Sequence, residues 1–259
     1  MSFKYSSRRI LTIFLVILFI EFALDIDIFS SLIFPKYKDK RPSFNIIITT
    51  SGRSTLIKML QSIAPQLHAR DYLTIISDKE HDTVDRTLSR IRCRCKITHI
   101  SNPEPLGFWG HGSRTRWQNE LPGDYHMNAD DDDIYDPHAM EIVRSVIGMS
   151  LEPHLYVFHM IRRWDGVVDI IPPLGVQGIL KKQIGTPCGV YRKIPNLPSW
   201  HGSYGGDGNF YRALSDRVMV TFVPEIIYQV GQDEDLLSIK HTMLENEYNY
   251  LPPGLPPED

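Results

Sequence analysis

Short apolar runs alternate with segments of helical periodicity through the first half of the chain. The runs begin at Phe44, Leu73 and Ile97, and each is followed by a polar loop and then by apolar residues at helical spacing. A short continuous apolar run is typical of a strand that is covered on both faces. Alternation of such strands with helices predicts an α/β fold with a mixed, mainly parallel sheet flanked by helices. The helices are expected at 54–64, 82–92 and 114–121.

Polar loops follow the strands of this predicted sheet. The sequence TTSGR, Thr49 to Arg53, follows the first strand, Asp78 ends the second, and a glycine-rich loop, Gly107–Ser113, follows the third. Ligands bind such sheets beyond the carboxyl ends of the strands, so we expect these loops to meet around one crevice. The glycine-rich loop matches neither the dinucleotide fingerprint nor a Walker loop, and its motif predicts no phosphate site.

The fourth strand is expected to end in an acidic run, Asp130 to Asp133, within the segment GDYHMNADDDDIYDP. Four adjacent carboxylates repel one another, and at the end of a buried strand this repulsion costs stability unless a cation lies among them. Carboxylate oxygens suit a hard divalent ion such as Mg²⁺ or Mn²⁺. In an extended chain Asp130 and Asp132 point one way and Asp131 and Asp133 the other, so one pair can bind metal while the other serves the fold. The alternative is an acidic surface turn before the helix at Pro137.

The second half of the chain contains one isolated carboxylate, Asp207, in the segment PSWHGSYGGDGNFYRAL. An aspartate at the start of a short helix is ordinarily a helix cap. Trp200 and His201 precede it, and exposed aromatic rings beside a carboxylate suit a sugar, which makes these two residues candidates for binding an acceptor. Both interpretations of Asp207 stay open. Strands are expected at 155–159, 167–171 and 185–192 and on both sides of Pro224, with helices at 138–149, 209–214 and 236–247.

The amino end differs from the rest of the chain. Basic residues precede an apolar segment, 10–24, and apolar residues continue to residue 34. No small-residue cleavage site follows, which favours a short cytoplasmic tail and an uncleaved single-pass membrane anchor over a signal peptide. Basic residues flank both sides and no N-glycosylation acceptor occurs, so these features do not determine the orientation. The expected location is the Golgi or ER lumen side in a eukaryote and the cytoplasmic side in a bacterium. The expected divisions are the anchor (1–34), a charged linker (35–43), the catalytic domain (44–250) and a proline-rich tail (251–259).

Charge and cysteine content argue against two other kinds of site. A net charge of −3 provides no electrostatic attraction to nucleic acid. The three cysteines lack the spacing of a zinc site. Cys93 and Cys95 stand too close together to bridge comfortably along a strand.

The order of these motifs resembles that of the GT-A glycosyltransferases, most closely the family 2-like ones. The resemblance covers residues 44–241 and rests on TTSGR, Asp78, the acidic run and the Gly-Gly-Asp before a late helix. It implies a single Rossmann-like GT-A domain that transfers a sugar from a nucleotide-sugar donor, with a UDP-sugar expected. The acceptor would be a hydroxyl group of a glycan, lipid or protein, and the transfer would invert the anomeric carbon.

The resemblance also implies roles for individual residues. Asp207 would be the catalytic base, although Gly206 stands where the family usually has Glu. Either Mn²⁺ or Mg²⁺ would be bound by Asp130, Asp132 and Asp133, with His241 as a further ligand. Arg114 and Arg116 follow the glycine-rich loop, and Arg116 is expected near the leaving diphosphate. The donor-binding residues would be Thr49, Ser51, Arg53, Asp78, Arg116 and Asp130.

Two alternatives remain open at this stage. A sugar nucleotidyltransferase has a similar sheet and acidic metal site, but its first loop is commonly rich in Gly, Arg and Lys, and it releases pyrophosphate. A membrane-tethered sugar-binding module without catalytic activity would bind a donor and not hydrolyse it. The product of the reaction therefore separates all three functions.

Overall fold

The computed structural model describes residues 41–78, 81–148, 152–180, 182–203, 205–232, 235–240 and 242–244. The chain divides into two units, Met1–Arg41 and Pro42–Asp259, and every described residue except Arg41 belongs to the second. The predicted anchor (1–34), most of the linker, His241 and the tail (251–259) lie outside the described residues. Within those ranges, no helix is long and apolar enough to cross a membrane. The anchor stays a prediction from the sequence.

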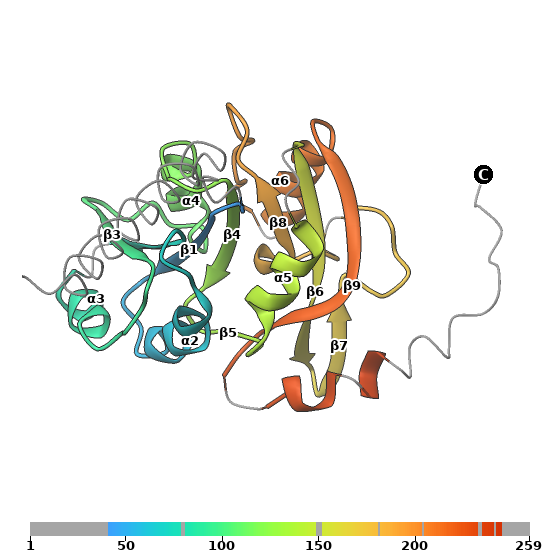
Figure 1. Cartoon of the computed structure of the whole chain (residues 1–259), viewed down its shortest axis with the longest axis horizontal. Coiled ribbons are helices and arrows are strands. Elements are labelled where there is room, and N and C mark those ends of the chain that lie inside the picture. The colour runs from blue at the N-terminus through green and yellow to red at the C-terminus, as the bar shows by residue number, and fades with distance from the viewer. Residues whose placement is uncertain are drawn as a thin grey trace, which may run out of the picture. The chain divides into compact units, whose positions relative to one another are not determined.

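Nine strands in the described part of the chain form one mixed sheet (Figure 1). The strands are β1 (Phe44–Thr50), β2 (Tyr72–Asp78), β3 (Lys96–Asn102), β4 (Tyr125–Asp130), β5 (Ile134–Tyr135), β6 (His154–Trp164), β7 (Val167–Ile171), β8 (Gly189–Arg192) and β9 (Met219–Gln229). Their order is β3-β2-β1-β4-β8-β6-β9-β5, with β7 beside β6. The first four are parallel, whereas β8 runs antiparallel to both β4 and β6. The α/β class is confirmed, and the parallel half consists of the strands that alternate with helices.

Helices cover both faces of the parallel half of the sheet. The helices are α2 (Leu56–Ile63), α3 (His81–Leu88), α4 (His111–Trp117), α5 (Ala139–Ile147) and α6 (Gly206–Ser215), with 3₁₀ turns η1 (Ala64–Gln66), η2 (Thr186–Cys188) and η3 (Leu237–Ile239). Ile46 and Ile48 of β1 belong to the same hydrophobic cluster as the buried side of α2. Ile47 belongs to a different cluster, together with Leu121 and with Trp117, the last residue of α4. Successive side chains of a strand point to opposite faces, so α2 and α4 lie on opposite sides of β1. The predicted inward residues of α2 are all buried, namely Leu56, Met59, Leu60 and Ile63.

Several element boundaries differ from the sequence expectation, among them those of α4 and β9. Helix α4 begins at His111, inside the predicted glycine-rich loop, and ends at Trp117. Strand β9 is continuous through Pro224 instead of being two short strands. Its pairing with β6 is irregular between the partners of Val157 and His159, which is where Pro224 falls. A proline nitrogen has no hydrogen to donate, so a break in the ladder accommodates it.

Cys93 and Cys95 form a disulfide, so the expectation that they would not bridge was wrong. The two residues lie in the non-strand segment directly before β3. Their Cα atoms are 5.2 Å apart, within the usual range for a disulfide. Cys188 is a free, buried thiol.

His126 of β4 makes the stability of the fold depend on pH. Burial lowers the pKa of this imidazole from 6.5 to about 4, and the ring lies 3.1 Å from the carbonyl oxygen of Pro122. As the pH falls below about 6.5, the unfolded chain binds a proton that the folded chain does not bind. The contribution of His126 is therefore complete above about pH 6.5 and is lost progressively toward pH 4.

We expect this histidine alone to lower the free energy of unfolding by about 2 kcal/mol between pH 7.5 and pH 5. Urea unfolding of the wild type and of His126→Gln at both pH values measures the effect, and the variant should lose less stability on acidification. His138→Gln is the matched control, because the side chain of His138 is 71% exposed. Equal acid sensitivity of His126→Gln and the wild type would remove His126 as the cause.

Candidate active site

A cavity of about 530 Å³ lies at the carboxyl ends of the parallel strands. It is lined by residues of the loops after β1, β2, β3 and β4, so the predicted convergence of these four loops is confirmed. Seven of the sequence-predicted donor and metal residues line this cavity: Thr49, Ser51, Arg53, Asp78, Asp130, Asp132 and Asp133.

A second cavity of about 250 Å³ adjoins the first. Trp109 and Asp130 line both cavities and therefore stand at their common border. Asp207, His111 and Thr186 line the second cavity. The predicted metal site and the predicted base thus face neighbouring spaces that meet beside Asp130.

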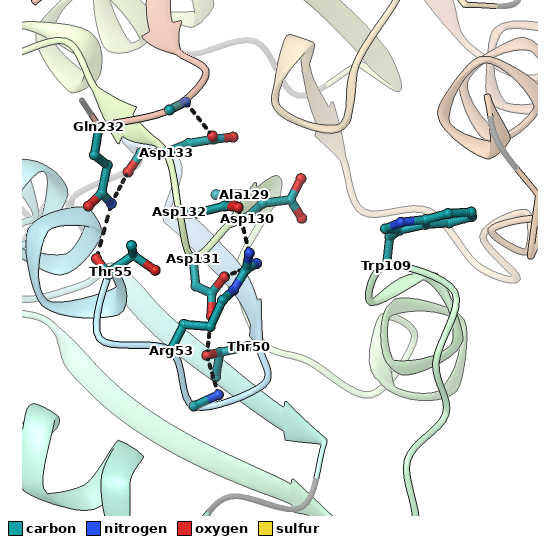
Figure 2. A network of polar contacts seen from close by, with 12 residues as sticks. Thr50, Arg53, Thr55, Trp109, Ala129, Asp130, Asp131, Asp132, Asp133 and Gln232 are labelled. Carbon is teal, nitrogen blue, oxygen red and sulfur yellow. Dashed lines mark hydrogen bonds and ion pairs between the residues drawn. The ribbon is translucent and has the colours of Figure 1, made fainter. Parts of the chain in front are cut away.

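The acidic run divides into an exposed pair and a buried pair, as its alternation predicts. The side chains of Asp130 and Asp132 are 34% and 42% exposed, whereas Asp131 and Asp133 are buried. Asp131 accepts a hydrogen bond from Thr50 and pairs with Arg53, as Figure 2 shows. Asp133 accepts a hydrogen bond of 2.7 Å from the backbone N–H of Gly231. The buried pair therefore makes the contacts that hold the strand end in place. Asp133 also lines the cavity, but Asp130 and Asp132 are its more exposed carboxylates.

A fully buried arginine, Arg114, joins the acidic run to the turn before α4. Its guanidinium donates to the Asp130 carboxylate at 2.6 Å, to the Ala129 carbonyl at 2.9 Å and to the Trp109 carbonyl at 3.0 Å. Arg114 is thus the arginine that reaches the predicted metal site. Figure 2 shows Asp130 directed toward the side on which Trp109 lies.

Arg116 does not face the acidic run, which corrects its predicted place near the donor. Its side chain is 58% exposed, pairs with Glu120 at 3.2 Å and lies over the ring of Trp117. Residues two apart on a helix lie on nearly opposite sides, so when Arg114 points into the protein Arg116 points away from it. Both arginines were candidates from the sequence. In the structure Arg114 lies on the buried side of α4 and Arg116 on its exposed side.

The chemistry and charge of the exposed carboxylates fit a divalent ion. Two guanidinium groups, from Arg53 and Arg114, face the four carboxylates of the run. Burial, followed by the negative charge of Asp130, raises the pKa of Asp133 well above its ordinary value. A hard cation would relieve this repulsion and would find carboxylate oxygens as ligands.

In the described part of the chain, no three His, Cys, Asp or Glu side chains are already arranged to hold a metal. Arg53 lies 2.6 Å from Asp132, and its side chain is 49% exposed. Binding of an ion by Asp130 and Asp132 would require Arg53 to turn away, and its exposure leaves room for that movement. Asp130 and Asp132 would then bind the ion, and Asp132 would no longer pair with the Arg53 guanidinium.

The turn from Gly107 to Gly110 has an uncommon backbone conformation. All four residues have positive φ, including Phe108 at 55° and Trp109 at 54°. Consecutive left-handed residues with side chains are costly, and such strain persists where the surrounding structure holds it, often at functional sites. Here the N–H of Gly107 donates to Asp78 at 3.1 Å, and a Cβ atom at Gly110 would collide with Thr49. The turn is held against the ends of β1 and β2.

Trp109, and not Trp200, is the exposed aromatic residue beside the carboxylates. Trp109 is 69% exposed and lines both cavities. Trp200 is buried, stacks on Phe210 at 4.0 Å and donates its indole N–H to Gln118 at 3.0 Å. The predicted acceptor-binding role of Trp200 is therefore wrong, because its ring forms part of the core. His201 is exposed, and it is not among the described residues that line the two cavities.

Asp207 lies in the first turn of α6 and does not cap it, since Gly205 occupies the cap position. Its Oδ1 lies 2.8 Å from Nε2 of His111 and accepts a hydrogen bond of 3.1 Å from the Thr186 hydroxyl. Its side chain is 21% exposed, on the second cavity. The helix-cap interpretation is wrong. His111 was not singled out from the sequence, where only its place between two glycines marked it.

The fold is shared with solved structures of TarS and of a mannosyltransferase. The crystal structure of S. aureus TarS 1–349 has a TM-score of 0.59 at 13% identity, over 80% of this chain and 66% of that one. TarS 1–349 in complex with UDP-GlcNAc has a TM-score of 0.52 at 13% identity, over 74% and 59%. The mannosyltransferase PcManGT from Pyrobaculum calidifontis, in complex with GDP-Man and Mn²⁺, has a TM-score of 0.55 at 12% identity, over 76% and 58%.

The chain thus spans about two thirds or less of each of these structures. No protein-family model and no curated protein sequence matches it. The structural likeness confirms the predicted GT-A fold, a mixed curled sheet flanked by helices.

Proposed function

We propose that this chain is a glycosyltransferase that moves a sugar from a nucleotide-sugar donor to an acceptor hydroxyl. One observation carries the proposal: two cavities meet at Asp130 and Trp109, and the larger contains the acidic run while the smaller contains Asp207. The proposed transfer needs this division, because the acceptor hydroxyl must reach the anomeric carbon of the donor from the face opposite the leaving diphosphate. The shared fold supports it, since related structures contain UDP-GlcNAc or GDP-Man.

The larger cavity would bind the donor. Thr49, Ser51 and Asp78 offer hydroxyl and carboxylate groups for the base and ribose of a nucleotide, with a UDP-sugar as our proposed donor. Asp130 and Asp132 would hold Mn²⁺ or Mg²⁺, which when bound neutralises the diphosphate as it leaves. Arg114 would keep Asp130 in position from the protein side.

The smaller cavity would bind the acceptor. Asp207 would take the proton of the acceptor hydroxyl while the oxygen attacks the anomeric carbon and the diphosphate leaves from the opposite face. This single displacement inverts the anomeric configuration. Trp109 stands at the border of the cavities, where its exposed ring would pack against the sugar being transferred.

A donor panel tests this function on the full-length protein. The protein is incubated with different nucleotide sugars, with and without Mn²⁺, and released nucleoside diphosphate is measured. We expect release from one donor to require metal and to fall about 10²-fold in Asp132→Ala, because that carboxylate holds the ion at the diphosphate. Asp85→Ala is the matched control, since it removes a 64% exposed carboxylate on α3.

Other outcomes of the same experiment identify the alternatives. Pyrophosphate released from a nucleoside triphosphate would indicate a sugar nucleotidyltransferase. Donor binding without any release would indicate a sugar-binding module. Release that does not depend on metal and is unchanged in Asp132→Ala would contradict the proposed role of the acidic run.

A further inference from the structure

The imidazole of His111 is buried between two oxygen atoms. Its Nε2 lies 2.8 Å from Oδ1 of Asp207, and its Nδ1 lies 2.7 Å from the carbonyl oxygen of His201. A carbonyl oxygen can only accept, so Nδ1 carries a hydrogen and donates it. Nε2 and Oδ1 can then form a hydrogen bond only when a proton lies between them. Two groups in such contact take up protons as a pair and not as separate residues.

Gly206 makes the approach of this imidazole possible. A Cβ atom at position 206 would lie 2.6 Å from Nδ1 of His111 and would collide with the carbonyl oxygen of His201. The residue before Asp207 therefore lacks a side chain where the imidazole passes over the helix start. The same glycine replaces the usual Glu of the family that the sequence resembles, so the structure gives a reason for that departure.

The contacts also orient the Asp207 carboxylate. His111 and Thr186 both contact Oδ1. In the described part of the chain Oδ2 has no hydrogen bond or ion pair, and Asp207 lines the smaller cavity. Oδ2 is therefore the oxygen that can meet an acceptor hydroxyl.

We propose that His111 is a positioning residue for Asp207 and that the two residues act as one proton-accepting pair. This inference rests on the proposed transferase function. In the reaction the acceptor O–H bond breaks and its proton goes to the pair through Oδ2. The hydroxyl oxygen bonds to the anomeric carbon, and the nucleoside diphosphate leaves with the electrons of the broken C–O bond. The resting pair already shares one proton between Nε2 and Oδ1. A second proton added at Oδ2 by acid prevents it from accepting the proton of the acceptor, so acid inactivates the enzyme through the pair.

Other ionisable side chains lie around the pair of Asp207 and His111. Burial raises the pKa of Cys188 to about 12 and that of Tyr211 well above its ordinary value. Arg162, which pairs with Asp169, and Lys182 also line the cavity, as does Asp130, which Arg114 holds. The arginine and lysine side chains keep their charge across the neutral range.

The first test needs no substrate. Histidine ring signals of the full-length ¹⁵N-labelled protein are followed by NMR between pH 5 and 9, and His111 is assigned by its absence in His111→Gln. We expect Asp207→Asn to change the pH dependence of the His111 ring signals, because the carboxylate that shares the proton is lost. Gly206→Ala, which displaces the ring and keeps both side chains, should weaken this coupling. An unchanged His111 titration in Asp207→Asn would overturn the inference, whether or not the protein transfers sugar.

The second test uses the pH profile of kcat/KM with the active donor. In His111→Gln the acid limb should move by about one pH unit or more, which a purely structural role would not produce. His138→Gln removes the exposed partner of Glu141 and should leave the profile unchanged. A His111→Gln enzyme with the wild-type profile would overturn the catalytic use of the pair. Coupled titration in a protein that transfers no sugar would leave the pair in place and reject the transferase function instead.

Discussion

Asp207→Asn is expected to lower kcat for sugar transfer by about 10²- to 10⁴-fold, the usual contribution of a positioned general base. The amide keeps the size of the carboxylate and cannot accept the acceptor proton. Binding of the donor should change little, because Asp207 lines the smaller cavity and the acidic run lines the larger one. Kinetics with the active donor and acceptor, together with donor-induced stabilisation against heat, measure the two effects separately.

Asp216→Asn is the matched control for this prediction. Asp216 is an exposed residue at the carboxyl end of the same helix, α6, so its substitution should leave kcat unchanged. Full transfer by Asp207→Asn would assign the proton to another group. A product that retains the anomeric configuration of the donor, determined by NMR, would reject the single displacement itself.

The sequence predicted those parts of the fold that depend on local pattern. Continuous apolar runs such as Ile46 to Ile48 are buried on both faces of the sheet, and strands of this kind can be recognised without tertiary information. The alternation within the acidic run was also predictable, because it follows from the geometry of an extended chain. The convergence of the loops followed from parallel strand order.

Predictions failed where contacts distant in sequence decide the role of a side chain. The residues next to Trp200 in the sequence do not show whether its ring is exposed. In the structure the ring is buried, where it stacks on Phe210 and donates a hydrogen bond to Gln118. Trp109 is exposed because a run of left-handed residues turns it outward, and a sequence pattern does not specify that backbone. His111 is 96 residues from Asp207 in the sequence, a separation across which no local motif connects them.

Arg114→Met is expected to lower the free energy of unfolding by about 3 kcal/mol. Removal of one partner from a buried ion pair ordinarily costs about 3 to 5 kcal/mol, because the other charge is left buried without compensation. Asp130 keeps 34% exposure, which lets water compensate part of the loss and places the expected value at the lower end. The carbonyl oxygens of Ala129 and Trp109 also lose a donor, and unsatisfied buried acceptors are costly.

Arg116→Met on the same helix is the matched control. Its ion pair with Glu120 is exposed on both sides, and such pairs contribute little to stability, so the variant should resemble the wild type in urea unfolding. Adding Asp130→Asn to Arg114→Met tests the cause of the effect. If the stranded carboxylate is responsible, the double variant should lose less stability than the two single losses added together, by about 1 kcal/mol or more.

The same variant should loosen the turn that carries Trp109. The Arg114 guanidinium binds the Trp109 carbonyl and the Asp130 carboxylate at once, so it fixes the exposed ring beside the acidic run. Without it, strain in the run from Gly107 to Gly110 is no longer opposed from the protein interior. Hydrogen exchange at these backbone amides should become faster in Arg114→Met and stay unchanged in Arg116→Met. Equal exchange and equal stability in the two variants would show that the turn and the acidic run are held by other contacts.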